Sequence, residues 1–262
     1  MAKRKTDAKR KPGGTTRGPA SRGTRTTNVE RLRDEILEAS LRHVAFDGWT
    51  AKALAAGARD TGAGATGLAR AFPGGPRDAA KHFGALTDRR MTEALGRQLR
   101  RKPLKTHERI AAAVRARLRI LASHREAVRR LVAFLALPVN ATLAARLLWR
   151  SADAVWRAAG DTSTDFNYYT KRALLAGVYG STLLFWLADG SEDFAATDAF
   201  LERRIADVMK IFSLRGRLKS AGDGLAFVRG LGETLGPFVP PGLLRRFGQW
   251  FRPRRSSRPE SG

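Results

Sequence analysis

Three aspartates lie close enough in the sequence to suggest general acid–base chemistry, which needs carboxylates held near a reacting group. They are Asp153, Asp161 and Asp165. The last two flank the run Thr162-Ser163-Thr164 at the expected start of a helix, where carboxylates and hydroxyls cap free backbone N–H groups. Capping therefore accounts for these two aspartates without catalysis.

The sequence also contains no pattern typical of a metal site or of an activated nucleophile. No Glu-x-x-His pair is present to build a helical metal site, and no Ser–His–Asp order, P-loop or nucleophile elbow occurs. The chain has no cysteine, which excludes disulfides and thiolate zinc sites. We expect a protein that is not an enzyme and holds no cofactor or metal. The histidines are expected at the surface or at helix caps: His43, His82, His107 and His124.

Residues 62–67 match the pattern GxGxxG through Gly62, Gly64 and Gly67. That pattern binds a dinucleotide when a strand precedes it and a helix follows, so that the pyrophosphate meets the helix N-terminus. Residues 51–60 have a helical pattern instead. We interpret the glycines as a loop between two short helices, and an oxidoreductase using this loop is the weakest functional alternative.

The elements that carry these residues are predicted to be helices throughout. Apolar residues recur at helical spacing, as in Ile36, Leu37, Leu41 and Val44, and Thr50 is placed to cap the second helix. No run alternates with period two between hairpin turns, so we expect an all-α fold. The helices are expected at about 29–46, 51–60, 65–71, 77–100, 106–122, 124–136, 140–159, 166–188, 193–213 and 217–235.

The formal charge of +25 favours an anionic partner, such as nucleic acid, anionic lipid or an acidic protein. Residues 1–28 hold nine Lys and Arg against the single acid Asp7, and residues 245–262 hold six Arg against Glu260. Residues 1–28 contain no apolar run that would form a secretory signal. We interpret them as a disordered basic tail.

From residue 29 to Phe72, the order of helices and turns resembles the helix-turn-helix domain of TetR-type regulators. The supposed recognition helix, Gly64–Ala71, has Arg70 as its one charged residue and no Asn or Gln that would read base edges. We therefore expect a TetR-like module that binds no specific nucleic acid. A TetR-type DNA-binding transcriptional regulator is the main alternative function.

Two segments, Leu131–Ala145 and Ala173–Ala188, carry no charge. Each is shorter than the ~20 residues that a membrane span requires. Such helices either form ordinary core or line a cavity for an apolar ligand, and the small residues Gly177 and Gly180 favour the cavity. The predicted lipid-binding residues are Leu131, Phe134, Leu135, Leu148, Leu174, Val178, Leu183 and Leu184.

The C-terminal segment is predicted to contact a membrane. After Pro240 and Pro241, apolar residues recur at helical spacing with arginines beside them, a pattern typical of a cationic helix lying in the lipid interface. The alternative is a terminal helix that docks on its own domain. The predicted membrane-binding residues are Leu243, Leu244, Arg245, Arg246, Phe247, Trp250 and Phe251.

The stretch from Trp156 to Asp189 includes the run Gly-Asp-Thr-Ser-Thr-Asp-Phe-Asn-Tyr-Tyr-Thr at residues 160–170. Together with His43–Thr50, Phe72–Gly75 and Ala136–Asn140, it resembles the coenzyme Q biosynthesis protein nine family. The resemblance covers about residues 32–219. It implies a TetR-like helical bundle that has lost DNA binding, is usually dimeric and has an apolar pocket for an isoprenoid quinone or phospholipid.

The resemblance also implies partners. Members of the family are not catalytic, meet the membrane through an amphipathic C-terminal helix, and bind the di-iron demethoxyubiquinone hydroxylase. Mitochondrial members carry Trp where this chain has Tyr168, which keeps an aromatic side chain at that position. By similarity, the partner-binding residues are Asp153, Trp156, Asp161, Asp165, Asn167, Tyr168, Tyr169 and Arg172.

These expectations divide the chain into a basic tail (1–28), a TetR-like helical lipid-binding domain (29–219) and an amphipathic membrane-binding tail (220–262). The expected location is peripheral, at the cytoplasmic face of a bacterial inner membrane, or at the matrix side of the mitochondrial membrane in a eukaryote.

Overall fold

The computed structural model describes residues 20–162 and 166–217, and all the regular structure in these ranges is helical. The all-α prediction is confirmed there, and the predicted helix at 217–235 lies outside them. The α-helices are α1 (Ala20–Asp47), α2 (Ala51–Asp60), α3 (Gly64–Ala71), α4 (Pro76–Arg101), α5 (Thr106–Ala122), α6 (Arg125–Ala136), α7 (Ala141–Ala158), α8 (Phe166–Ala188) and α9 (Ala195–Arg217), with 3₁₀ turns η1 (Pro138–Asn140) and η2 (Glu192–Phe194).

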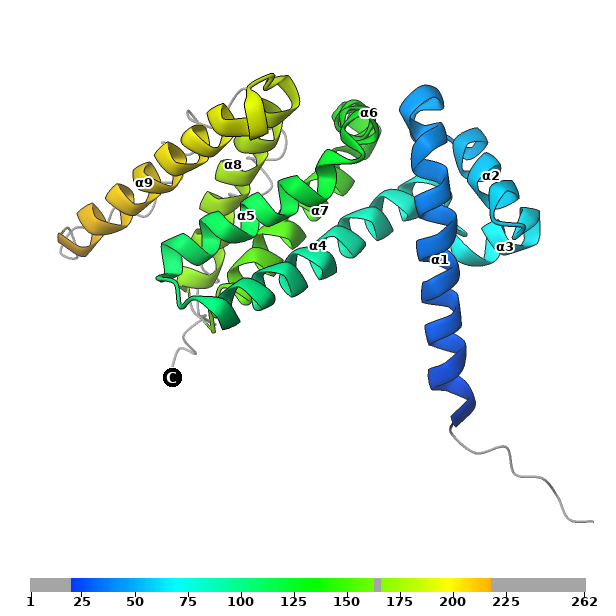
Figure 1. Cartoon of the computed structure of the whole chain (residues 1–262), viewed down its shortest axis with the longest axis horizontal. Helices are drawn as coiled ribbons and strands as arrows, with labels where there is room; N and C mark the ends of the chain where they lie inside the picture. The colour runs from blue at the N-terminus through cyan, green and yellow to red at the C-terminus, as the bar shows by residue number, and fades with distance from the viewer. Residues whose placement is uncertain (1–19, 163–165, 218–262) are drawn as a thin grey trace, which may run out of the picture.

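The helices form two connected groups (Figure 1). Helices α1, α2 and α3 make a small N-terminal group, and the long helix α4 runs from it into a bundle that contains α5, α7, α8 and α9. Helix α6 lies between the two groups and contacts both α1 and α7. Helices α4 and α6 therefore connect the N-terminal group to the bundle, which contains residues 160–170, the run that resembles the family.

Helix α1 begins at Ala20, earlier than the expected start near residue 29. Residues 20–28 are polar and lack an apolar stripe, so hydrophobic spacing gives no helical signal there. Once the packed part of α1 has formed, each further residue adds a backbone hydrogen bond without a new nucleation step. Helix α1 therefore includes the end of the stretch 1–28 that was expected to be a tail.

Helices α1 and α2 pack closely against each other, and Gly57 lies at their contact. The Thr50 side chain accepts a hydrogen bond from the Ala53 backbone N–H at 3.2 Å, which confirms it as the cap of α2. A Cβ atom at Gly57 would lie 2.2 Å from Ser40 Oγ and 2.6 Å from Ser40 N. Since backbone atoms of α1 block this position, no larger residue fits without moving the two helices apart.

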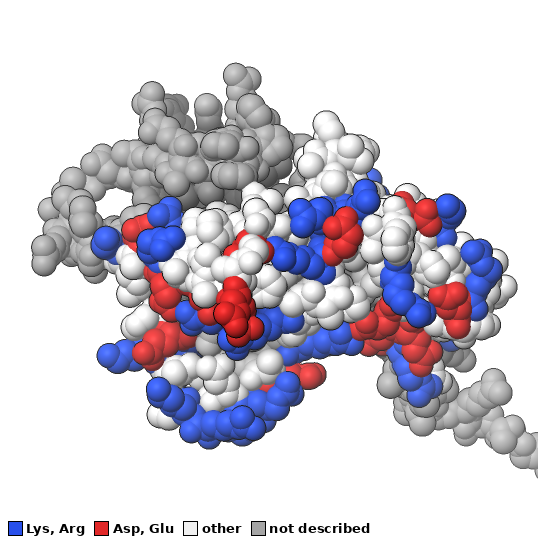
Figure 2. Space-filling view, turned by 45° about the horizontal axis from the view of Figure 1, so that its top comes forward, with Lys and Arg blue, Asp and Glu red and all other residues white. Residues whose placement is uncertain are grey.

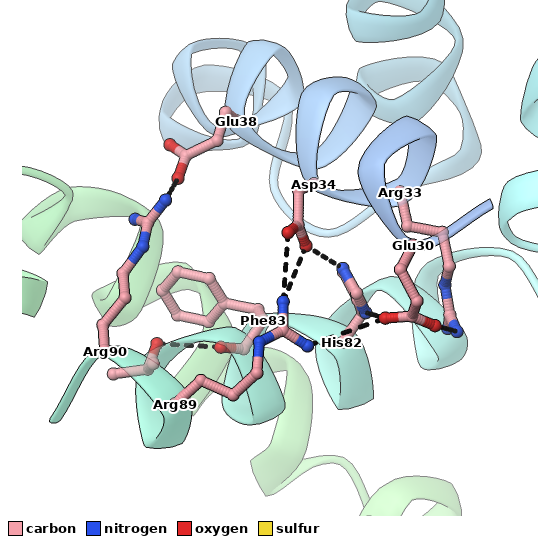
Figure 3. A network of polar contacts seen from close by, with 9 residues as sticks. Glu30, Arg33, Asp34, Glu38, His82, Phe83, Arg89 and Arg90 are labelled. Carbon is pink, nitrogen blue, oxygen red and sulfur yellow. Dashed lines mark hydrogen bonds and ion pairs between the residues drawn. The ribbon is translucent and has the colours of Figure 1, made fainter. Parts of the chain in front are cut away.

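Charged side chains join α1 to α4 (Figure 3). His82 Nε2 lies 2.6 Å from Asp34 Oδ1, and Arg89 Nη2 donates to both Asp34 oxygens at 3.0 Å. Arg90 pairs with Glu38 at 2.5 Å one turn further along α1. His82 is only 3% exposed, so its predicted surface or cap position is wrong. Burial lowers the pKa of His82 although Asp34 acts in the opposite direction.

A second buried ion pair ties α4 to α5 and α8. Arg117 pairs with Asp88 through Nη1, and its Nε donates to the Tyr179 hydroxyl at 2.8 Å. Burial raises the pKa of Asp88 despite the nearby arginine. The middle of the bundle is therefore fixed by polar contacts as well as by its apolar core.

Candidate functional site

The sharp turn after α7 positions the first residues of the run 160–170. Gly160 has φ +91°, a conformation that glycine adopts without steric cost. Its N–H donates to Arg157 O at 3.0 Å, and the Asp161 N–H donates to Trp156 O at 3.0 Å. These two bonds form a Schellman motif, which closes α7 and turns Asp161 back toward the helix.

Arg172 on α8 connects the two aspartates that flank this turn. Its Nε donates to Asp153 Oδ1 at 2.6 Å, and its Nη1 donates to Asp161 Oδ2 at 3.1 Å. The Arg172 side chain is 2% exposed. Burial raises the pKa of Asp153, but the hydrogen bond and charge of Arg172 outweigh it, and the net shift is downward. Such a carboxylate stays ionised and is a poor general acid or base near neutral pH.

Aromatic side chains surround this arginine. Its guanidinium lies 3.5 Å from the ring centroid of Tyr168, and the Tyr168 hydroxyl donates to Asp153 at 3.2 Å. Trp156 Nε1 donates to Lys171 O at 2.9 Å. We name these residues the α7–α8 cluster: Asp153, Trp156, Asp161, Tyr168, Lys171 and Arg172.

One aromatic residue beside the α7–α8 cluster faces solvent. Tyr169 is 50% exposed, and its ring packs edge-on against Tyr168 at 5.1 Å and lies 6.1 Å from Trp149. The cluster thus supports an exposed aromatic side chain. Asp165 and the Asn167 side chain lie outside the described residues.

Five of the eight predicted partner-binding residues therefore belong to the α7–α8 cluster, with Tyr169 next to it. The eight predicted residues do not all lie at the surface, because Arg172 and Trp156 are buried. Arg172 is inside because two carboxylates compensate its charge, an arrangement that residue spacing alone does not reveal. Their role in partner binding stays a prediction.

The predicted lipid-binding residues lie on α6, α7 and α8. Leu174 and Val178 are buried, and the other six are half-buried. A Cβ atom at Gly180 would lie 3.7 Å from Leu148, an ordinary contact distance, so this leucine lines the space beside Gly180. Two surface pockets, of about 440 Å³ and 210 Å³, are lined by other residues of the described chain. Lipid binding at these positions stays a prediction.

The ends of α6 and α8 are held together by arginines. Arg125 donates to the carbonyls of Trp186, at 2.6 Å, and Asp189, and Arg129 donates to Leu187 O at 3.0 Å. Cationic donors at a helix C-terminus satisfy carbonyls that have no partner within the helix. These bonds fix the two helices that contain the uncharged segments Leu131–Ala145 and Ala173–Ala188 relative to each other.

The GxGxxG pattern, residues 62–67, lies where α2 ends and α3 begins. Gly62 and Gly64 have φ +70° and +61°, and they join α2 to α3. A helix precedes the glycines, as expected, but α3 begins at Gly64. The interpretation as a loop is therefore right for Gly62 and wrong for Gly64 and Gly67, which belong to the start of α3. The exposed residues of α3 include Ala65, Thr66 and Arg70, which offer one charged side chain. Within the described ranges, no group of three or more His, Cys, Asp or Glu is placed to hold a metal ion.

Comparison with known proteins gives the family. The family model named COQ9 matches residues 141–212, which run from α7 into α9. The chain is 36% identical to ubiquinone biosynthesis protein COQ9-B, mitochondrial, of Xenopus laevis over 210 residues, 77% of this chain and 70% of that protein. The chain belongs to the COQ9 family.

Other COQ9 proteins give the same picture. The bovine protein, ubiquinone biosynthesis protein COQ9, mitochondrial, is 38% identical over 208 residues, and the Schizosaccharomyces pombe protein of the same name is 31% identical over 203 residues. The bovine match covers 77% of this chain and 64% of the bovine protein, and the yeast match covers 76% of this chain and 78% of the yeast protein. The resemblance seen in residues 160–170 is confirmed, and the run lies within the part that the COQ9 model matches.

Proposed function

We propose that the chain is a non-catalytic accessory protein of ubiquinone biosynthesis. It binds an isoprenoid quinone intermediate at a membrane surface and presents it to the demethoxyubiquinone hydroxylase. The observation that carries the proposal is the α7–α8 cluster in a member of the COQ9 family. Its carboxylates are neutralised by Arg172 rather than left available for chemistry, and it supports an exposed tyrosine.

Within this proposal the cluster residues have two roles. Arg172, Trp156 and Asp161 position α8 against α7, because their polar atoms are used inside the protein. Tyr169 contacts the hydroxylase, since its exposed ring stands on a rigid base. Large aromatic side chains held in this way contribute strongly to protein–protein binding.

The lipid is proposed to lie among α6, α7 and α8. Half-buried leucines on all three helices, such as Leu131, Leu148 and Leu183, support this placement, because they offer apolar surface that the core does not fully use. Each CH₂ group of an isoprenoid tail gains roughly 0.8 kcal/mol when it leaves water. We propose that α6, α7 and α8 separate to admit the tail.

The membrane tail, dimer and fold type complete the proposal. We propose that the arrangement of α1–α9 is TetR-like, that the chain forms a homodimer, and that residues 220–262 hold it peripherally on the membrane that carries ubiquinone synthesis. The related COQ9 proteins are named as mitochondrial, which supports such a membrane.

The test is binding of the purified hydroxylase to the full chain and to Tyr169→Ala. We expect binding to weaken about tenfold or more with an unchanged melting temperature, as for a central aromatic contact. Phe46→Ala is the matched control, since Phe46 is an 86% exposed aromatic on α1. Unchanged capture of the hydroxylase by the Tyr169 variant would show that the cluster does not present the binding surface.

A further inference from the structure

The corner between α6 and α7 exposes two aliphatic side chains on a fixed backbone. The two helices meet at 95°. Asn140 is buried, and its Nδ2 donates to Phe134 O at 2.9 Å, which ties the turn η1 to the end of α6. Leu137 is 50% exposed and Val139 is 70% exposed. We call Leu137, Pro138 and Val139 the α6–α7 corner.

The chain around this corner carries an excess of arginine. From Ala127 to Ala152 the sequence has four arginines and no Asp or Glu. Arg129 and Arg130 pair with Glu126, at 3.1 and 3.2 Å, and Arg146 and Arg150 follow the corner on α7. On the face shown in Figure 2, blue and red side chains are mixed over most of the surface, while an uncharged projection stands out in the region of α6. The corner therefore combines an apolar tip with cationic surroundings.

A small basic pocket is lined by the start of α7, three residues after Val139 in the chain. It has a volume of about 210 Å³, and Thr142 and Leu143 form one wall. Arg77 and Lys81 on α4 and Arg146 on α7 also line it. Its one acid, Asp78, is taken by Lys81 at 2.9 Å and by the Gly74 N–H. Arg77 and Arg146 make no ion pair within the described part of the chain.

We infer that the α6–α7 corner inserts into the interface of an anionic phospholipid bilayer. Leu137 and Val139 enter the acyl region, and the pocket formed by Arg77, Lys81 and Arg146 receives a lipid phosphate. Apolar tips with flanking cations bind bilayers in this way, because each part interacts with the layer that suits it. Two aliphatic side chains are too few for the core of a protein–protein interface of about 800 Å² per partner.

The shape of the corner sets the depth of insertion. No single described helix is long and apolar enough to cross a membrane, while α6 and the segment Pro138–Ala158 pass that test together. Their 95° bend presents a tip instead of a straight span. The contact is therefore shallow. It deepens the membrane placement of the proposed function, and it adds a surface of the helical body to the predicted C-terminal helix.

The absence of cysteine allows a position-specific test in the full chain. Val139→Cys and, as control, Thr66→Cys on α3 are each labelled with the polarity-sensitive dye NBD. Vesicles contain phosphatidylcholine with or without phosphatidylglycerol. We expect a blue shift and a severalfold rise in emission at position 139 with phosphatidylglycerol vesicles, and no change at position 66.

The possible failures are distinguishable. Protein that floats with the vesicles while position 139 stays in water would overturn the corner inference and leave the membrane placement standing. Protein that does not float would contradict both. An equal shift at position 66 would show unspecific adsorption of a highly basic chain, and the inference would again fail.

The pocket is tested with Arg146→Gln against Arg203→Gln, an exposed arginine on α9 that makes no ion pair in the described part of the chain. We expect about fivefold weaker binding to phosphatidylglycerol vesicles for the Arg146 variant only, since one cation near an anionic surface contributes on the order of 1 kcal/mol. Equal losses in both variants would assign the effect to net charge and contradict a phosphate pocket.

Discussion

Arg172 is the residue whose removal most directly tests the structure of the α7–α8 cluster. It shares the carboxylate of Asp153 with Arg157, which pairs with the other oxygen at 2.9 Å. The two arginines differ in burial, because the Arg172 side chain is 2% exposed and that of Arg157 is 68% exposed. Arg172→Ala and Arg157→Ala therefore form a matched pair around one acid.

The expected loss follows from the charges left behind. Removing one member of a buried ion pair costs about 3–5 kcal/mol, because the remaining charge is buried without compensation. Here Asp153 keeps Arg157 and Asp161 keeps Lys171, so the lower end, about 3 kcal/mol, applies. For a domain of this size, that loss lowers the melting temperature by roughly 6–12 °C.

The assay is thermal unfolding followed by circular dichroism, with urea unfolding as a second measure of the free energy. Arg157→Ala should leave the melting temperature nearly unchanged, since its side chain is exposed to water. Arg172→Lys should recover only part of the loss, because an ammonium group cannot bond two carboxylates as a fork. Equal melting temperatures for the two alanine variants would refute the buried cluster.

Three further predictions concern other parts of the chain. Gly57→Ala should lower stability by about 1–3 kcal/mol because of Ser40, whereas Gly84→Ala, with Leu147 at 3.4 Å, should be tolerated in the same urea titration. Hydrogen bonds from Thr197 and Ser191 lower the pKa of Asp189, and Arg172 lowers that of Asp153 against burial, both from an ordinary 3.8. The stabilisation by these two carboxylates should be complete above about pH 3.8 and lost as the pH falls below it. Asp189→Asn should therefore flatten the acid limb of the curve of stability against pH. Deleting residues 243–262 should weaken flotation with anionic vesicles, and undiminished flotation would contradict the predicted tail helix.

The helices could be predicted because their apolar spacing and caps are local properties. Thr50 and the stripe that includes Ile36, Leu41 and Val44 behave as expected, and the last three residues are buried. The start of α1 could not be predicted, because residues 20–28 lack that spacing. Helix prediction thus succeeded where one face of the helix is used for packing.

The candidate site was located by sequence, but its internal arrangement was not. Residues 160–170 indicated the region, while the burial of Arg172 depends on two aspartates that only the turn at Gly160 brings together. His82 is a similar case, because its partner Asp34 lies on another helix. The α6–α7 corner was missed as a surface, since an uncharged segment does not reveal which of its residues face solvent.

The most direct test of the central claim is native mass spectrometry, with organic extraction, of the protein purified from its own host. The proposed function predicts a co-purifying isoprenoid quinone, which the extract identifies by mass. A protein that carries no lipid and instead shifts a specific DNA duplex would contradict the proposal and favour a TetR-type regulator.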